Sequence, residues 1–239
     1  MSQGPAARTG EEALTASQAA ARAVRDALAQ SRSQRDELLV LAGHDIRNAI
    51  GIVDSALTMI EDAPDLAPSM YAMMRRATHR MGILVRALVD VDQLQRDAMP
   101  LTPAASRWGI VVTPVVEAAV AIAATKGVTI RELGPSDTAL TCDATIVERT
   151  VTALLDHAIG MTPDGSTVDV EGTRIAENRF RVRIAHPGRA VAIEALEKYF
   201  TTLPLRYARL AAVRHGGALR AVSPLENGAG FAFDFELTA

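Results

Sequence analysis

The sequence predicts an α+β protein in which a helical hairpin is followed by an α/β sandwich domain. The first part carries two proline-free stretches, over 11–60 and 69–97, whose apolar residues recur at steps of three and four. After Trp108, short strand-like alternations take turns with short helical segments. The length of 239 residues suits two small domains, since a domain commonly holds roughly 100–200 residues.

The composition is that of a folded protein rather than a disordered one. Hydrophobic residues make up 49% of the chain, charged residues 22%, and the net charge of −3 gives no reason to expect nucleic acid as a partner. No apolar run approaches the roughly 18 residues that cross a bilayer, and the first residues lack a secretory signal. The single cysteine, Cys142, excludes a disulfide framework and a multi-thiolate metal site. We therefore expect a cytoplasmic protein with no membrane partner.

Residues 1–35 are expected to form a flexible tail and a helical leader. Residues 1–10 are small and polar, and a weak seven-residue rhythm follows from Glu11. From Leu39 the helical pattern sharpens, and it ends where Pro64 and Pro68 interrupt it. Its apolar stripe consists of Leu39, Ala42, Ile46, Ile50, Val53, Leu57 and Ile60.

A second helix is expected over 69–97, so that residues 36–99 form a hairpin. Its stripe consists of Met70, Met74, Ala77, Met81, Leu84, Leu88, Val91 and either Leu94 or Gln95. One hairpin buries only part of each stripe, and a homodimer with a four-helix bundle is the simple way to cover the rest. The alternative is a larger bundle within one chain, for which the remaining sequence offers no matching long helices.

Pro100 and Pro103 mark a boundary, and residues 108–239 are expected to form the second domain. The alternation of Phe231, Phe233 and Phe235 with polar neighbours is the clearest strand signal. The expected strands cover 128–133, 139–142, 168–174, 180–185, 218–223 and 231–237, and the expected helices cover 113–124, 144–161, 192–200 and 203–214. This order predicts one sheet with helices on one face.

The segment His44-Asp45-Ile46-Arg47-Asn48 is the sharpest candidate for chemistry. His44 lies about 200° around the helix from Ile46, so it points away from the apolar stripe. Asp45 is placed to accept a hydrogen bond from the imidazole Nδ1, which leaves Nε2 as a nucleophile. Arg47 and Asn48 flank the ring, and Asn48 is placed to position a water or to bind a phosphoryl oxygen. The set suits phosphoryl transfer, with an ordinary surface histidine as the alternative.

The residues Leu41 to Ile50 resemble the H-box of sensor histidine kinases. The resemblance implies that His44 accepts a phosphoryl group, that Asp45 aids its attack, and that Asn48 supports dephosphorylation of a partner response regulator. It extends over about 35–239. The residues 88–94 look like the end of the second dimerisation helix, whereas Asp143, the segment 162–165, His215-Gly216-Gly217 and Gly228 to Phe231 look like parts of a Bergerat-type ATP-binding domain.

The chain departs from this family where the family binds ATP. The N-box asparagine that binds Mg²⁺ is matched by His157, its acidic neighbour by Ala153 and the following lysine by Gly160. The G1-box aspartate that reads adenine is matched by His186, and its second glycine by Ala190. The G2 box, at 202–206, contains no glycine, and the ATP lid is short.

Each departure weakens nucleotide binding for a physical reason. Loss of the carboxylate removes a charge-assisted hydrogen bond worth roughly 1.5–3 kcal/mol. Histidine is a poor ligand for Mg²⁺, which prefers hard oxygen ligands. A loop without glycine does not bring its amides close to phosphates. We therefore expect a domain that keeps the fold and has lost ATP, with no cofactor and no metal.

The favoured function is a histidine phosphotransferase of a phosphorelay, in which His44 exchanges a phosphoryl group with receiver-domain aspartates. The expected partners are response regulator receiver domains, an upstream histidine kinase and a second copy of the chain. Three alternatives stay open: an atypical active autokinase, a non-catalytic scaffold that docks on a kinase or a receiver, and a phosphatase that uses Asn48. The flank of Arg47, Asn48, Gly51 and Asp54 is the expected docking surface.

Overall fold

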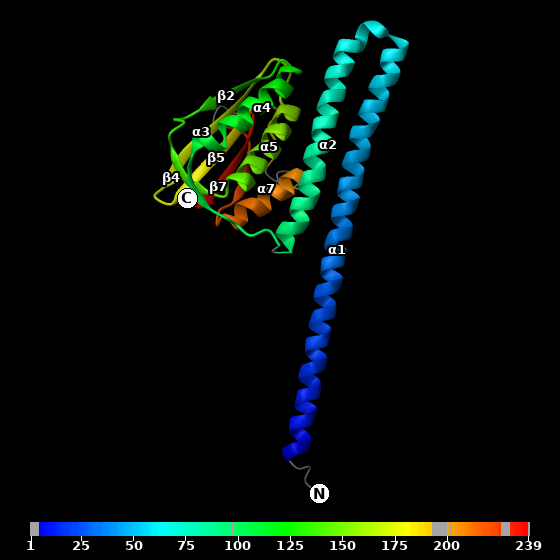
Figure 1. Cartoon of the computed structure of the whole chain (residues 1–239), viewed down its shortest axis with the longest axis vertical. Coiled ribbons are helices and arrows are strands. Elements are labelled where there is room, and N and C mark those ends of the chain that lie inside the picture. The colour runs from blue at the N-terminus through cyan, green and yellow to red at the C-terminus, as the bar shows by residue number, and fades with distance from the viewer. Residues whose placement is uncertain (1–4, 97, 193–199, 201, 226–229, 239) are drawn as a thin grey trace. The chain divides into compact units, whose positions relative to one another are not determined.

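The computed structural model describes residues 5–96, 98–192, 200, 202–225 and 230–238. Contacts divide the chain into two compact units, Met1–Leu41 and Ala42–Ala239. The described part of the first unit belongs to the long helix α1, whereas the second unit holds the hairpin and the whole α/β domain (Figure 1). No helix in the described ranges is both long and apolar enough to cross a bilayer.

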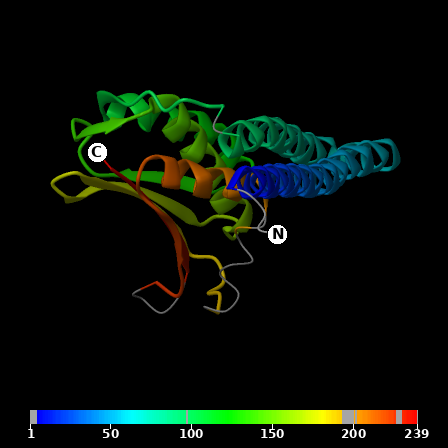
Figure 2. The same cartoon turned by 90° about the horizontal axis from the view of Figure 1, so that it is seen from below.

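Helix α1 runs over Pro5–Asp62, the 3-10 turn η1 over Pro64–Leu66 and helix α2 over Ala67–Gln95. Helix α1 thus begins at Pro5, and a proline fits the first turn of a helix because its missing N–H needs no partner there. At the other end, Pro64 cannot continue the hydrogen-bond ladder, so the helix ends before it. From Ala42 onward, α1 lies antiparallel beside α2 (Figures 1 and 2).

Small side chains face inward along this part of α1. Ala42, Ala49 and Ala56 are buried at a spacing of seven residues, whereas Ile50 and Leu57, which the sequence placed on the buried stripe, are about half exposed. The expected stripe is therefore wrong within one chain, because the hairpin pairs through the smaller residues. On α2 the expected stripe is closer to the observation, since Met70, Ala77, Leu84, Val91 and Leu94 are buried.

A small two-stranded sheet follows the hairpin. Strand β1, Ala104–Arg107, pairs antiparallel with β3, Ala139–Cys142. The expectation that 139–142 joins the main sheet is wrong, because its partner is the linker segment before helix α3, Trp108–Val111. The side chain of Asp143 accepts hydrogen bonds from Thr102 and from the backbone N–H of Ile146.

The main sheet has the order β2-β4-β5-β7-β6. Its strands are β2 (Thr129–Leu133), β4 (Thr167–Ala176), β5 (Arg179–His186), β6 (Leu219–Val222) and β7 (Phe231–Thr238). Only the pair β2 and β4 is parallel; the other pairs are antiparallel. Helices α4 (Thr113–Ala124), α5 (Ala144–Met161) and α7 (Leu203–Arg214) cover one face of it, as expected (Figure 2). The helix expected over 192–200 lies almost entirely outside the described residues.

The second face of the sheet is lined by paired charges. Arg183 pairs with Asp234, and both Arg179 and Arg220 pair with Glu236. The acidic side chains of β7, Asp234 and Glu236, are consequently buried, although they alternate with the phenylalanines of the core. Long arginine side chains from the neighbouring strands cover them, which strand alternation alone does not reveal.

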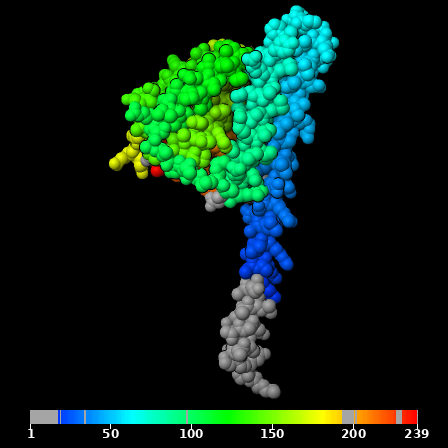
Figure 3. Space-filling view, in the orientation of Figure 1, coloured from blue at the N-terminus to red at the C-terminus, as the bar shows by residue number. Residues whose placement is uncertain are grey.

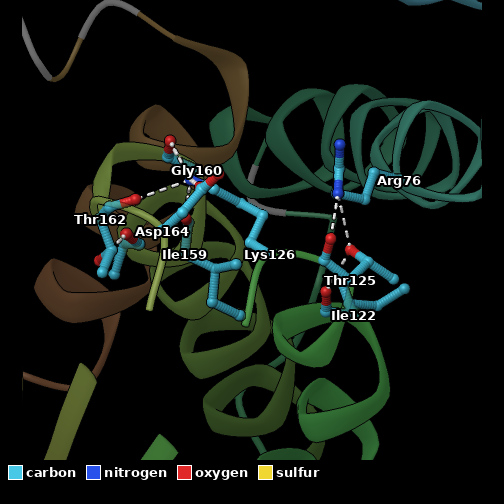
Figure 4. A network of polar contacts seen from close by, with 9 residues as sticks. Arg76, Ile122, Thr125, Lys126, Ile159, Gly160, Thr162 and Asp164 are labelled. Atoms are coloured by element: carbon cyan, nitrogen blue, oxygen red, sulfur yellow. Dashed lines mark hydrogen bonds and ion pairs between the residues drawn. The ribbon is translucent and has the colours of Figure 1, made fainter. Parts of the chain in front are cut away.

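The side chain of Lys126 caps the carboxyl end of α5. Its Nζ donates to the carbonyl oxygens of Ile159, Gly160 and Thr162 at 2.7–3.2 Å, and it lies 3.7 Å from the exposed carboxylate of Asp164 (Figure 4). A cation at this position satisfies helix carbonyls that have no intrahelical partner and complements the helix dipole.

Replacing Lys126 by methionine is expected to lower the free energy of unfolding by about 2–3 kcal/mol, because partly buried carbonyl groups lose a charged donor. Urea unfolding of the full chain measures the change. The matched control is Asp164→Asn, which removes only a solvent-exposed partner and should change stability by less than about 0.5 kcal/mol. Equal effects of the two substitutions would contradict this role of Lys126.

Candidate functional site

His44 stands on the outer face of α1, as the sequence predicted. About two thirds of its side-chain surface is exposed, and Asp45 beside it is partly buried. The ring nitrogen Nδ1 lies 3.3 Å from Oδ1 of Asp45 and 3.3 Å from the side-chain nitrogen Nδ2 of Asn48, one turn further along the helix. The geometry therefore brings together three of the four expected residues at one edge of the imidazole.

Both contacts fall on the same nitrogen, and each requires a different protonation state of it. A carboxylate only accepts hydrogen bonds, so the contact with Asp45 requires a proton on Nδ1. The contact with Asn48 is made by its side-chain nitrogen Nδ2, which donates to an unprotonated Nδ1, so the two hydrogen bonds belong to different tautomers of the ring. In the tautomer that pairs with Asp45, Nε2 carries the lone pair, and it makes no hydrogen bond with the described part of the chain.

Arg47 belongs to the same exposed face but does not touch His44. The described residues give its guanidinium no hydrogen bond or ion pair, so its charge is available to a partner. The space around two nearby glycines is also open: a Cβ built on Gly43 or Gly51 would meet no heavy atom within 4 Å. Gly51, three positions after Asn48, therefore leaves open space on this side of α1.

The residues aligned with the family's nucleotide site form an apolar and aromatic cluster instead. The His157 ring packs edge-on against Phe233 at 5.4 Å, and Ala153, where the family has an acidic residue, is buried. The His186 ring stacks on Phe231 at 5.6 Å. Phe231 and Phe233 pack against each other at 4.9 Å, and Phe200 joins at 6.3 Å from Phe233.

His186 folds back over its own loop. Its Nδ1 accepts the backbone N–H of Gly188 at 3.1 Å, and the ring would lie 2.6 Å from a Cβ at that glycine. The glycine therefore makes room for an imidazole of this chain rather than for a ligand. Burial lowers the pKa of His186 to about 4, with the positive charge of Lys126 as a further cause.

His157 shares this character. Burial lowers its pKa to about 4, and the neighbouring His186 and Arg80 lower it further. Both imidazoles are therefore neutral at pH 7. Helix α7 begins at Leu203 with Pro204 in its first turn, and both Leu203 and Leu205 are buried, so the G2-like segment supplies core side chains where a phosphate loop would need glycines.

These residues do not fit Mg-ATP. The carboxylate that would pair with an adenine amino group is replaced by a buried histidine that is already bonded to its own loop. Within the described ranges, no group of three or more His, Cys, Asp or Glu side chains is arranged to hold a metal ion.

Comparison with known proteins gives the fold. The histidine kinase AdeS of Acinetobacter baumannii matches with a TM-score of 0.60 and 20% identity, over 82% of this chain and 97% of that chain. Full-length ShkA in complex with AMPPNP matches with a TM-score of 0.58 and 19% identity, over 85% of this chain but only 46% of ShkA. The nucleotide-free catalytic domain of the histidine kinase ThkA matches with a TM-score of 0.52 and 20% identity, over 59% of this chain and 97% of the ThkA domain. No protein-family model and no curated protein matches the sequence.

The chain therefore has the histidine kinase fold, as its resemblance to the sensor histidine kinases implied. The likeness to AdeS and ShkA includes the helical part as well as the α/β domain. The observed α+β architecture confirms the predicted fold class.

Sequence reasoning located His44, Asp45 and Asn48 correctly as neighbours but missed the aromatic cluster. The alternation of Phe231 and Phe233 indicated a buried strand face, yet nothing in the pattern showed that His157 and His186 would pack on it. It also missed Lys126, whose contacts join residues more than thirty positions apart.

The two buried histidines predict a loss of stability in acid. In the unfolded chain each has a pKa near 6.5, so between about pH 6.5 and 4 the unfolded state binds more protons than the folded state. The contribution of the two neutral imidazoles to the free energy of unfolding is fully present above pH 6.5 and is lost as the pH falls toward 4. When the pH falls from 7.5 to 5.0, the free energy of unfolding of the wild type should decrease by about 1–2 kcal/mol per histidine more than that of the double variant His157→Asn/His186→Asn. Urea unfolding at the two pH values measures this difference. His79→Asn is the control, and identical pH profiles of the double variant and the wild type would contradict the assignment.

Proposed function

We propose that this protein is a phosphotransfer component of two-component signalling. His44 receives a phosphoryl group from the aspartyl phosphate of one receiver domain and passes it to the aspartate of another. The observation that carries the proposal is the contact of the Asp45 carboxylate with Nδ1, which holds a proton there and leaves Nε2 of an exposed imidazole as the nucleophile.

The transfer balances with the residues present. Nε2 attacks phosphorus, the P–O bond to the receiver aspartate breaks, and that aspartate leaves as a carboxylate. The imidazole ring gains positive charge as the P–N bond forms, and Asp45, 3.3 Å from Nδ1, stabilises this charge. The reverse sequence loads the next receiver, and no proton has to leave the ring.

The α/β domain supports the choice of a receiver rather than ATP as the phosphoryl donor. Its nucleotide positions hold neutral, buried imidazoles among phenylalanine rings, and a bound triphosphate would find no carboxylate for adenine and no glycine-rich loop for phosphates. We propose that this domain acts as a structural and docking element.

The exposed apolar side chains of the hairpin support a homodimer. Ile50, Leu57, Val85 and Val89 each expose about half of their surface, and Tyr71 exposes more. A four-helix bundle formed by two hairpins would cover such residues, and the hydrophobic effect then favours association. The receiver would dock on the flank formed by Arg47, Asn48, Gly51 and Asp54, which are all exposed.

Substitution of His44 by alanine is expected to abolish phosphoryl transfer. The assay mixes the full chain with receiver domains of the source organism, phosphorylated with radiolabelled phosphoramidate, and follows label on each protein. Asp45→Asn should slow the transfer at least tenfold because the charge on the imidazole is no longer stabilised. His79→Ala is the matched control and should retain the wild-type rate. Label that persists on His44→Ala would contradict the proposal.

Mg-ATP is expected to give no saturable binding heat at concentrations up to about 1 mM, which corresponds to less than about 4 kcal/mol of binding free energy. Isothermal titration calorimetry of the full chain measures this, with an ATP-binding histidine kinase as the positive control. Saturable binding together with label from ATP on His44 would identify an autokinase instead.

A further inference from the structure

Helix α2 has two separate tracks of buried residues. The hairpin track has the seven-residue spacing of the buried alanines of α1 and consists of Met70, Ala77, Leu84 and Val91. The second track, named the docking track, consists of Ile83, Ala87, Asp90 and Leu94. At 100° per residue, the two tracks are centred about 100° apart around the helix. The docking track therefore needs a partner other than α1.

Helix α7 supplies that partner, because it is also buried on two sides. One set of its residues belongs to the core of the α/β domain: Leu205, Ala208 and Ala212. A second set, at steps of four, is buried but lies outside that core cluster: Leu203, Tyr207 and Ala211. Helix α7 packs against α2, and Tyr207 borders the same space as Asp90. The space-filling view shows the α/β domain lying directly against α2 (Figure 3).

Two charge-assisted hydrogen bonds lie at the carboxyl end of the docking track. Arg149 of α5 donates to the carboxylate of Asp90 at 2.6 Å, and Asp90 is almost fully buried. Arg214, at the end of α7, donates to the backbone carbonyl oxygen of Leu94 at 2.9 Å. Such bonds are directional, so they fix the register of α5 and α7 along α2 in addition to the apolar packing.

A third contact joins α2 to the α/β domain nearer the start of the helix. Arg76 donates to the carbonyl and the hydroxyl oxygens of Thr125, which follows α4 (Figure 4). From Arg76 to Leu94, α2 extends over about 27 Å at 1.5 Å per residue. A cavity of about 450 Å³ remains among α2, α4 and α5, so polar contacts rather than dense packing bridge the helices on this side. Contacts spread over such a length prevent the domain from pivoting about any one of them.

The chain segment that connects α2 to the α/β domain is attached to the same corner of the domain. Thr102 donates from its backbone N–H and its hydroxyl to the carboxylate of Asp143, at 3.0 and 2.9 Å. The backbone N–H of Asp143 donates in turn to Nε2 of His215, the residue that follows Arg214. The end of the connecting segment is thus held where α7 meets α2.

We infer that the docking track holds the α/β domain in a fixed position on the hairpin, so that the two move as one body. Domains that share only a small polar interface move relative to each other by default, whereas an apolar seam with several directional contacts opposes this motion. About two thirds of the His44 side-chain surface is exposed in this arrangement. The fixed domain is therefore no lid over His44, whose face stays open to a partner. The inference does not depend on phosphotransfer by His44.

Double electron–electron resonance of the full chain tests the inference without any phosphoryl donor. Spin labels on Arg75→Cys of α2 and Glu117→Cys of α4, both at exposed positions, report the distance between the hairpin and the α/β domain. The native Cys142 is buried, and an excess of unlabelled chain removes distances between copies. We expect one distance distribution, no wider than that of the reference pair Glu117→Cys/Glu177→Cys within the α/β domain. A wider distribution, or a second distance, would overturn the inference.

Substitutions on α2 test whether the docking track is responsible. Asp90→Lys places a second cation beside Arg149 and should broaden the distribution toward longer distances. Asp92→Asn is the matched control, because Asp92 pairs with Arg96 within α2, and it should leave the distribution unchanged. If Asp90→Lys fails to fold, Arg149→Met takes its place, since it leaves the carboxylate of Asp90 without its donor and should also broaden the distribution. A distribution that stays as narrow as that of the wild type in the variant used would contradict the role of the docking track.

Discussion

The packing of small side chains inside the hairpin is the constraint on which the face that carries His44 depends. Ala42, Ala49 and Ala56 point inward at a spacing of seven residues, and this fixes the rotation of α1 about its axis. A residue two positions after Ala42 then lies about 200° away, which places His44 in solvent. Asn48, four positions further on, returns to the same side and reaches Nδ1. The reactive geometry is thus a consequence of helix periodicity and needs no strained backbone. Because alanine fills the inner face, the bulkier apolar residues of α1 remain on the outside, where a second hairpin would cover them.

In the α/β domain, apolar packing occupies the positions that align with the nucleotide site of the sensor histidine kinases. A continuous cluster of buried apolar residues lies under α4, α5 and α7. The imidazoles of His157 and His186 pack on Phe233 and Phe231 and extend the apolar core to these positions. Neutral histidines suit that position because their rings are apolar on the faces and make few demands at the edges. The same burial makes the domain sensitive to acid, since protonating a buried ring without a counter-charge is unfavourable.

Much of the fold could be predicted from the sequence, because its signals are local. The helices over 113–124, 144–161 and 203–214 were predicted with the observed bounds. The exposed position of His44 also followed from spacing alone. The pairing of 139–142 with Ala104–Arg107 was not predicted. The segment Ala104–Arg107 has no alternation of apolar and polar residues, so the sequence did not mark it as a strand. The rotation of the buried stripe on α1 failed for a related reason: a hydrophobic pattern shows which residues avoid water but not whether the same chain or another one covers them. The buried acidic groups of β7 depend on long side chains from neighbouring strands, which only the assembled sheet reveals.

The central claim is that Nε2 of His44 exchanges a phosphoryl group with a receiver aspartate and not with ATP. The most direct measurement is ³¹P NMR of the full chain carrying ¹⁵N-labelled histidine, with a phosphorylated receiver domain and Mg-ATP offered as donors in separate samples. The account predicts one phosphoramidate signal, coupled to Nε2 of His44, that forms from the receiver and is absent with Mg-ATP alone. A signal that forms from Mg-ATP alone, or a complete panel of the organism's phosphorylated receivers that leaves His44 unmodified, would contradict it.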